Sequence, residues 1–247
     1  MERRFFIRPG EISAQGVVRI HGAEAGHLSR VLRGKPGDRV ELVDGSGRTY
    51  RARLERVGAD HAIARVEEEM PFRLGESALD LELIQGLPRE NVFEEILRRV
   101  TELGVSGIQP VWAKRCQGRF PTSGRKSRWE KIIRESVKQC RRSVIPAIEN
   151  PLDAAEFLAR PLRGEGWILV PEGDPLKDHL KRSPDPPERL TLLVGPEGGW
   201  DPGETALARS AGYLPFSLGK RILRAETAAS LMVALAQFYF GDFGNSL

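Results

Sequence analysis

The sequence has few of the residues that build disulfide-linked or metal-dependent proteins. Its 247 residues include only two cysteines, Cys116 and Cys140, and four histidines. No histidine stands at a ligand-like spacing from a cysteine or from another histidine. We therefore predict no metal site. The two thiols can meet in space, but two free buried thiols in a reducing compartment are the favoured interpretation.

Long apolar runs are also absent. No segment approaches the roughly 20 apolar residues of a membrane-spanning helix. The first residues, MERRFFIRPGE, carry charges without an apolar stretch after them, unlike a secretory signal peptide. We therefore expect a cytoplasmic protein without a membrane partner.

The common phosphate-binding motifs are missing, although glycine is plentiful. Neither G-x-G-x-x-G nor G-x-x-x-x-G-K-[ST] occurs. The apolar run 190–194 ends instead at GPEGG, residues 195–199, and Asp201 with Glu204 supplies a helix start of its own. The carboxylate of Glu197 and the self-capped helix disfavour a phosphate ligand. A neutral or cationic ligand bound through backbone groups fits better, and a plain tight turn is the alternative.

Positive charge is concentrated in one stretch. Residues 114–142 carry eleven basic and two acidic side chains, a net charge of +9, whereas the whole chain has +4, so the rest has −5. Such a concentration usually faces a polyanion, which predicts contact with RNA or DNA. A solvated loop and helix face is the alternative. The few aromatic residues are interpreted as core, so we expect little stacking on bases.

Two patterns divide the chain. Alternating segments over residues 39–43, 50–57 and 61–66, joined by short glycine turns and interrupted by a helix over 24–32, predict a small antiparallel barrel. Residues 70–77 are interpreted as a linker. The remainder predicts an α/β domain, a parallel sheet with helices on both faces. Its expected strands are 79–84, 108–112, 167–170, 190–194 and 214–218, and its helices include 91–103, one from 127, one after Asp201, and 228–240.

Local signals predict how several helices begin and end. Asn91 with Glu94, and Ser127 with Glu130, have the spacing of capping boxes, and Gly104 is expected to close its helix in the left-handed conformation. Helix 228–240 is apolar almost all round, which predicts burial on several sides. Burial within one subunit and burial in a dimer interface are equally compatible with this pattern.

Ligands of open parallel sheets bind outside the carboxyl ends of the strands. Three loops of this chain are expected there: 171–173 (PEG), 195–199 (GPEGG) and 219–224 (GKRILR). The sequence therefore predicts that they form one ligand site.

VGPEGGW at 194–200, followed by SLGKRILRAETAA at 217–229, resembles the ribosomal RNA small-subunit uracil-N3 methyltransferase family of the SPOUT superfamily. Further matches occur in order along essentially the whole chain: RRFF at 3–6, His27 with VLRG at 31–34, TELGV at 101–105, and RW with KQCRRS between 128 and 143. The chain departs from the common pattern of the family at Gln85, Arg99, Lys138 and Arg141. We expect these differences to affect RNA contacts and not the reaction.

The resemblance implies a PUA-like, RNA-binding β-barrel over residues 1–72 and a SPOUT methyltransferase domain with a deep trefoil knot over 73–247. It also implies S-adenosyl-L-methionine as methyl donor and a homodimer with the active site at the interface. The implied reaction methylates N3 of a specific uridine in 16S rRNA, within the small ribosomal subunit. Ribose 2′-O-methylation of RNA and a non-enzymatic role in ribosome assembly are the alternatives.

Methyl transfer to uracil N3 needs a proton acceptor and positive charge near the carbonyl oxygens. We expect Arg224 to stabilise the developing anion, and Glu226 or Glu197 to orient it or to accept the proton. A surface or helix-capping cation is the alternative for Arg224. The residues expected to bind the cofactor are Leu169, Val170, Pro171, Glu172, Val194, Gly195, Pro196, Glu197, Gly198, Gly199, Ser217, Leu218, Gly219, Ile222, Leu223, Arg224, Thr227 and Ala228. Those expected to bind RNA are Arg3, Arg4, Arg30, Arg33, Lys114, Arg115, Arg128, Lys138, Arg141 and Arg142.

Overall fold

The computed structural model describes residues 3–117, 124–178 and 186–243. Arg119 of the basic stretch and His179 therefore lie outside the described residues. The chain divides into two compact units, residues 1–76 with 137–145 (unit 1) and residues 77–136 with 146–247 (unit 2). Compactness does not test independent folding, so the domain border after residue 72 stays a prediction.

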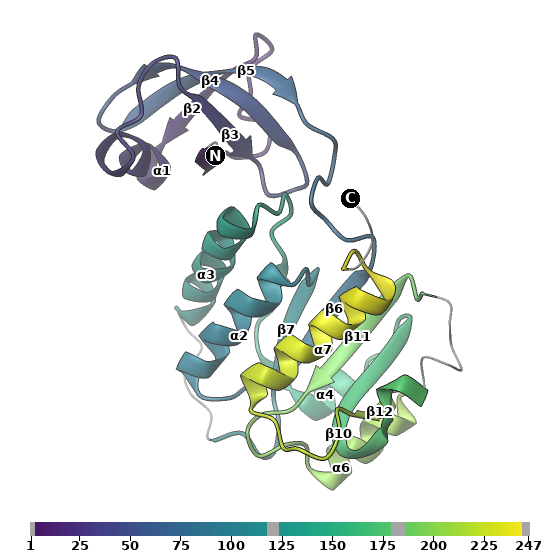
Figure 1. The fold of residues 1–247 in the computed structure, drawn as a ribbon. Helices are drawn as coiled ribbons and strands as arrows, with labels where there is room; N and C mark the ends of the chain where they lie inside the picture. Colours follow the sequence, from purple (N-terminus) through teal and green to yellow (C-terminus); the bar gives the residue numbers. More distant parts are fainter. Residues whose placement is uncertain (1–2, 118–123, 179–185, 244–247) are drawn as a thin grey trace. The chain divides into compact units, whose positions relative to one another are not determined.

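Unit 1 is built on a five-stranded sheet in the order β1-β3-β4-β5-β2 (Figure 1). Its strands are β1 (Arg3–Phe6), β2 (Val17–His21), β3 (Arg39–Val43), β4 (Thr49–Val57) and β5 (His61–Glu69). The three predicted strands of this region are confirmed. An entirely antiparallel arrangement is wrong, because β1 pairs with β3 in parallel. The chain between them crosses over through β2 and a helical segment, which is what a parallel pair requires.

Alternation along the strands fills the core of unit 1. Val40 and Leu42 of β3 and Ala52 and Leu54 of β4 are at most 1% exposed and pack together with Phe5. The predicted helix 24–32 is present, but it consists of a short α1 (Gly22–Gly26) followed by a π-helix, η1 (His27–Val31). A π-helix is rare and is often found at functional positions.

Unit 2 contains a seven-stranded sheet in the order β12-β10-β11-β6-β7-β8, with β9 pairing to β7. All its strand pairs are parallel, as predicted. Helices α2 and α7 cover one face and α4 and α6 the other (Figure 1). The strands are β6 (Asp80–Gly86), β7 (Gly107–Trp112), β8 (Ala147–Ile148), β9 (Leu152–Asp153), β10 (Glu165–Pro175), β11 (Arg189–Val194) and β12 (Leu214–Ser217), and the helices are α2 (Glu90–Glu102), α3 (Arg125–Cys140), α4 (Ala154–Leu158), α6 (Pro202–Ser210) and α7 (Ala225–Phe240).

Helix α6 begins as the sequence predicts. The Gly203 amide donates to Asp201 Oδ1 at 3.0 Å, and the Asp201 amide donates to Glu204 Oε2 at 2.9 Å. Pro202 is the first helical residue, where its missing N–H costs nothing. Every group of this capping box lies within four residues, so the short sequence specifies it.

The two other predicted capping boxes are wrong. Helix α3 already begins at Arg125, so Ser127 is inside it, and its hydroxyl donates to the Gly124 carbonyl. Helix α2 begins after Arg89 without a side-chain cap, and Glu94 instead binds Arg128. Gly104, which follows α2, does have the predicted left-handed conformation, with φ +93°.

Within the described ranges, no helix is both long and apolar enough to cross a membrane. The trefoil knot stays a prediction, because strand order and pairing do not establish whether a loop is threaded.

Candidate active site

The three loops expected to bind a ligand follow neighbouring strands. Strand β10 pairs in parallel with β11 on one side and with β12 on the other, so their carboxyl ends meet at one edge. Residues 170–173 form an irregular excursion within β10, because Leu169 and Asp174 both pair with Phe216 of β12. A Cβ on Gly173 would lie 2.3 Å from the Phe216 carbonyl carbon, so the chain at 173 packs directly on β12.

The GPEGG loop is a closed turn whose carboxylate has a distant partner. The Gly199 amide donates to the Pro196 carbonyl at 2.9 Å. Glu197 Oε1 accepts a 3.0 Å hydrogen bond from the amide of Arg89, the residue before α2. Glu197 therefore binds one of the free amides at the start of that helix. This contact gives Glu197 a structural role, and its predicted contact with the cofactor stays a prediction.

Residues 113–117, after β7, brace the same loop. The Lys114 amide donates to Glu204 Oε1 at 2.8 Å, and Lys114 Nζ lies 3.2 Å from Asp201 Oδ1. Arg115 Nη1 donates to the Gly198 carbonyl at 3.4 Å. The pKa of Asp201 is lowered, first by the Gly203 amide and then by Lys114. Two residues predicted to bind RNA thus contact the predicted cofactor loop and its helix.

The third loop leaves its charges unengaged. Arg224 is the exposed N-cap residue of α7, and its carbonyl accepts from the Ala228 amide at 2.8 Å. Among the described residues, no hydrogen bond or ion pair engages the side chains of Lys220, Arg221, Arg224 or Glu226. Thr227 is exposed and Ala228 is buried in the first turns of α7.

Parts of the main chain of the second and third loops are open. A Cβ on Gly199 or Gly219 would meet nothing within 4 Å, so the main chain there faces free space. Within the described chain, no backbone hydrogen bond involves residues 220–223, and Ile222 is 95% exposed. Uncharged donors and acceptors beside an apolar side chain fit a ligand with a flat ring and a cationic group.

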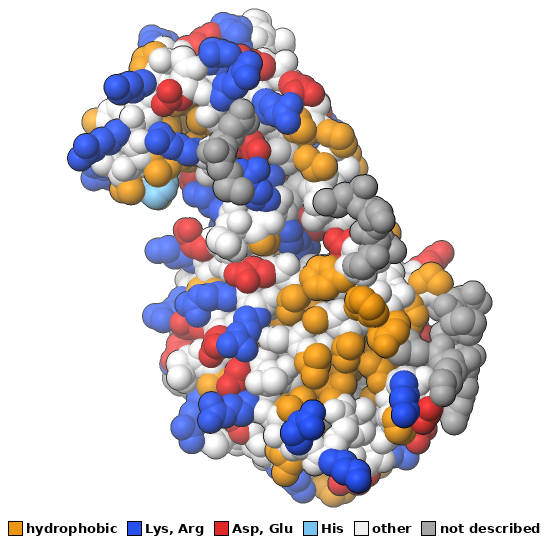
Figure 2. Space-filling model, in the orientation of Figure 1, with side chains coloured by type: hydrophobic (Ala, Val, Ile, Leu, Met, Phe, Trp, Pro, Cys, Tyr) orange, Lys and Arg blue, Asp and Glu red, His pale blue; other side chains and the backbone are white. Residues whose placement is uncertain are grey.

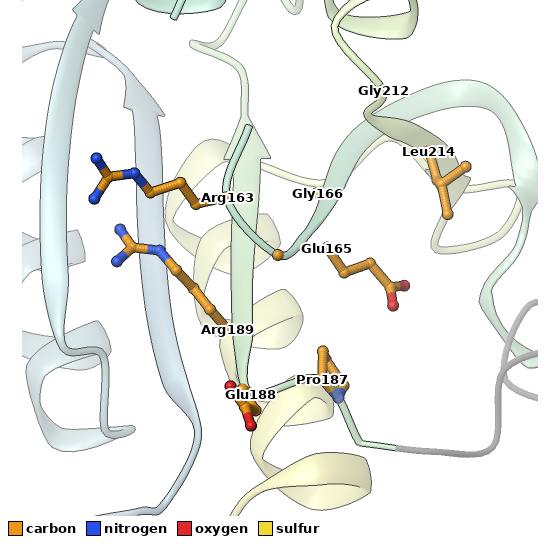
Figure 3. A pocket seen from close by; sticks show the side chains of 9 residues that line it. Arg163, Glu165, Gly166, Pro187, Glu188, Arg189, Gly212 and Leu214 are labelled. Atoms are coloured by element: carbon orange, nitrogen blue, oxygen red, sulfur yellow. The ribbon is translucent and has the colours of Figure 1, made fainter. Parts of the chain in front are cut away.

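A hollow of about 750 Å³ lies elsewhere in unit 2, at the opposite, amino-terminal ends of β10, β11 and β12 (Figure 3). Two of its charged side chains, Arg189 and Glu165, already have partners. Arg189 Nη1 lies 3.0 Å from Asp80 Oδ2, and Arg189 Nη2 lies 2.8 Å from Glu82 Oε2. Glu165 accepts from the indole of Trp167. The three loops follow the carboxyl ends of the same strands, so this hollow is separate from them.

Two of the predicted RNA-binding arginines are buried. Arg142 is 6% exposed, and its Nε and Nη2 lie 3.0 and 2.7 Å from Glu76 Oε2. Glu76 Oε1 accepts from the amides of Ser143 and Val144 at 2.7 and 2.8 Å. The Arg4 side chain is 6% exposed and binds Glu41, and burial lowers the pKa of Arg4. Both contribute to structure within unit 1, which argues against direct contact with RNA.

The other predicted RNA-binding residues are more accessible. Lys138 Nζ lies 3.0 Å from Glu24 and above the Phe5 ring, whereas Arg141 pairs with Glu41 at 3.3 Å. Arg128 binds Glu94 and keeps 64% of its side chain exposed. Arg3, Arg30 and Arg33 are exposed, and none has a hydrogen bond or ion pair to the side chains that the structure describes.

One expectation is wrong at Gln85, which was expected to affect RNA contacts. Its side chain is fully buried at the end of β6, against the GPEGG loop. Sequence reasoning also missed Arg89 and Gln117, whose side chains are joined by a 2.8 Å hydrogen bond. The signal available for Gln85 was a polar residue at the end of an apolar strand.

No metal centre is visible in the described part of the chain, where no three His, Cys, Asp or Glu side chains are grouped to hold an ion. Cys116 and Cys140 are free thiols, each half-buried. Burial raises the pKa of Cys116, which leaves its thiol protonated and unreactive at neutral pH.

Comparisons with known proteins agree with this geometry. The sequence model of the RNA methyltransferase domain matches residues 75–237, and that of the RNA methyltransferase PUA domain matches residues 20–67. Ribosomal RNA small subunit methyltransferase E of Synechocystis is 35% identical over 96% of this chain and 77% of that protein.

Two solved structures are similar over nearly the whole chain. Ribosomal RNA small subunit methyltransferase E from Neisseria gonorrhoeae, bound to S-adenosyl methionine, has a TM-score of 0.88 at 32% identity, covering 98% of this chain and 100% of that one. A Legionella pneumophila protein in complex with SAM has a TM-score of 0.88 at 29% identity, with the same coverage. The resemblance read from the sequence is confirmed: this chain belongs to the ribosomal RNA small subunit methyltransferase E family.

Proposed function

We propose that this protein transfers the methyl group of S-adenosyl-L-methionine to N3 of one uridine in 16S rRNA. The observation that carries the proposal is an unengaged cation, Arg224, in the last of three loops that follow β10, β11 and β12, two of which have open backbone at Gly199 and Gly219. The cofactor supplies an electrophilic methyl group on a sulfonium.

The residues that would hold the cofactor follow from the loops. Residues 169–172, 194–199 and 217–223 offer backbone groups and apolar side chains, and Thr227 with Ala228 continues this surface into α7. Backbone donors and acceptors can read the edge of an adenine ring without adding charge. The absence of a phosphate motif agrees with a donor that carries none.

The chemistry on uridine needs two groups of the protein. N3 loses its proton to a carboxylate, and its lone pair forms the new bond to the methyl carbon as the carbon–sulfur bond breaks. Arg224 stabilises the negative charge that spreads onto O2 and O4. Glu226 is the favoured proton acceptor of the two candidates, because one oxygen of Glu197 already binds the Arg89 amide.

We propose that exposed cations hold the RNA backbone and that the target uridine is unpaired or flipped when it enters the site. The cations without a partner among the described residues are Arg3, Arg30 and Arg33 in unit 1. In unit 2 they are joined by Arg115 and by Lys114 and Arg128, which keep 68% and 64% of their side chains exposed although each has a carboxylate partner. Since this substrate belongs to the small ribosomal subunit, the proposed place of action is the cytoplasm.

A homodimer forms part of the proposal. Helix α7 buries Met232 and Val233 within the subunit but exposes Leu231, Phe238 and Tyr239 by 37%, 59% and 48%. Figure 2 shows hydrophobic side chains gathered over α7. Contiguous exposed apolar surface of this kind commonly marks a protein interface.

Nucleoside mass spectrometry of small-subunit rRNA incubated with the protein and cofactor tests the reaction. We expect 3-methyluridine. A 2′-O-methylated nucleoside would replace our proposal with ribose methylation. Calorimetry that detects no binding of S-adenosylmethionine would favour a non-enzymatic assembly protein.

A further inference from the structure

The inner end of the GPEGG loop rests on one buried side chain. Gln85 is 0% exposed and stands opposite Val194 in the β6–β11 register. Its Nε2 lies 2.9 Å from the Gly86 carbonyl oxygen, 3.3 Å from that of Val194 and 3.1 Å from that of Gly195. The last two carbonyls belong to the point where the loop leaves β11.

The hydrogen-bond count at Gln85 is unbalanced. A carboxamide nitrogen has two hydrogens, and three carbonyl oxygens surround this one. Oε1 is buried and has no hydrogen-bond partner among the described residues. Three acceptors around one position require a donor there, so the orientation of the amide is fixed by its surroundings. Position 85 therefore needs a hydrogen-bond donor, whereas an acceptor there finds no described group that donates to it.

The rest of the β6–α2 connection holds the same loop. A Cβ on Gly86 would lie 2.5 Å from Pro196 Cδ and 2.8 Å from the Pro196 nitrogen, so the loop packs directly on the strand end. Three residues further on, the Arg89 amide binds Glu197 at 3.0 Å. Residues 85–89 therefore contact four successive residues, the last residue of β11 (Val194) and residues 195–197 of the loop.

We propose that Gln85 is a positioning residue that sets the place of the GPEGG loop and thereby the affinity for S-adenosylmethionine. The identity of the ligand in this inference rests on the proposed function. The claim that Gln85 holds the GPEGG loop in place does not depend on it. Without a donor at position 85, the buried Val194 carbonyl and the partly buried Gly195 carbonyl each lose this hydrogen bond, and such a loss in a buried place is costly. The loop then moves to satisfy them and leaves the geometry that binds the cofactor.

A neighbouring glutamine provides a matched control. Gln109 on β7 is 3% exposed, and its Nε2 donates to the Pro110 and Asn150 carbonyls at 2.7 and 3.0 Å. It has the same side chain, burial and type of bond, but it binds none of the three cofactor loops. Changing it tests the general cost of losing a buried glutamine from this sheet.

The experiment compares four full-length proteins: the natural chain, Gln85→Met, Gln109→Met and Gln85→Lys. Calorimetric titration with S-adenosylmethionine is combined with steady-state kinetics. We expect Gln85→Met to raise the Kd and the KM for the cofactor about tenfold to a hundredfold, with kcat at saturation changed far less. Gln109→Met should leave the Kd within about twofold. Gln85→Lys offers three N–H donors to three carbonyls, so its Kd should stay within about threefold.

Amide hydrogen exchange without cofactor separates this inference from the proposed function. Gln85→Met should exchange faster at residues 194–199 than the natural chain, and Gln109→Met should not. If the natural chain binds no S-adenosylmethionine, the proposed function fails, but the loop-positioning role is still tested by the exchange measurement. Unchanged exchange in Gln85→Met would overturn that role.

Three results would overturn the inference directly. One is a folded Gln85→Met protein with the natural Kd. Another is an equal loss of affinity in Gln109→Met. If Gln85→Met does not fold, Gln85→Lys decides, and a folded lysine variant that binds more than tenfold more weakly would contradict the role of the donor.

Discussion

The outer face of β4 and β5 in unit 1 and the loop after β12 in unit 2 are both rich in positive charge, but only one of them neutralises it. Four arginines on or beside these strands pair with a glutamate: Arg48 with Glu69, Arg51 with Glu68, Arg53 with Glu67 and Arg65 with Glu55. In the loop, Lys220, Arg221 and Arg224 have no such partner among the described residues.

This difference separates structural from functional charge better than the number of arginines does. A cross-strand pair places opposite charges on adjacent strands and supports one register of the sheet. An unpaired cation in a loop after a parallel strand remains available to attract the negative charge of a ligand. Since the basic stretch at 114–142 contains charges of both kinds, its net charge alone does not identify an RNA surface.

The largest effect expected from breaking a paired charge is at Glu76, whose partner Arg142 is buried. Glu76→Ala removes the acceptor of the Arg142 guanidinium and of the Ser143 and Val144 amides. Removing one partner of a buried ion pair costs about 3–5 kcal/mol. We expect the free energy of unfolding of unit 1 to fall by that amount, measured by hydrogen exchange of the β3 and β4 amides. A loss below about 1 kcal/mol would show that the site readily accepts water.

The largest effect expected from an unpaired charge is at Arg224. Arg224→Ala should lower kcat/KM for methylation by about 10²–10³, because a preorganised electrostatic group is lost, while the cofactor Kd changes little. Single-turnover methylation assays measure the first quantity and calorimetry the second. Arg221→Ala, in the same loop, is the matched control and should have a smaller effect. Near-normal turnover of Arg224→Ala would end its proposed catalytic role.

The same contrast explains what the sequence could predict. The capping box of α6 joins Asp201 to Glu204, three residues apart, and the sequence predicted it correctly. Five of the seven strands of the parallel sheet followed from apolar runs of the right length, whereas the two-residue strands β8 and β9 were missed. The family motifs supplied the reaction, which no periodicity reveals.

Contacts between distant segments could not be predicted from the sequence. Glu197 binds the amide of a residue 108 positions earlier, and Gln85 donates to carbonyls 109 and 110 positions later. No pattern near Arg142 in the sequence indicates that Glu76 is its partner. Arg142, which is buried and structural, was therefore predicted to bind RNA. Charge pattern identifies ionised groups, whereas the tertiary fold decides which of them are already neutralised.

A moderate effect is expected where unit 1 leaves arginines unpaired. Arg30 lies in the last turn of the π-helix and Arg33 follows in a left-handed conformation, with φ +49°, and both are exposed. Arg30→Ala combined with Arg33→Ala should weaken binding of small-subunit rRNA about tenfold. The slope of log K against log salt should become shallower by about two, one for each lost phosphate contact. An unchanged slope would exclude both residues from the RNA surface.

The smallest effect is expected when the paired arginines are removed. Arg51→Ala combined with Arg53→Ala deletes the same charge from the same unit, but these side chains already bind Glu68 and Glu67. The pKa of Glu67 is lowered chiefly by its hydrogen bond from Arg53 and further by Arg39, so in the variant that pKa should rise but stay below its ordinary value. RNA affinity should stay within about twofold, because arginines that are already neutralised by glutamates contribute little to phosphate binding in the natural chain. Filter binding measures the affinity, and NMR titration of the glutamate carboxyl measures the pKa. If this variant weakened RNA binding as much as the Arg30 and Arg33 pair, neutralisation by a glutamate would not distinguish the two kinds of arginine.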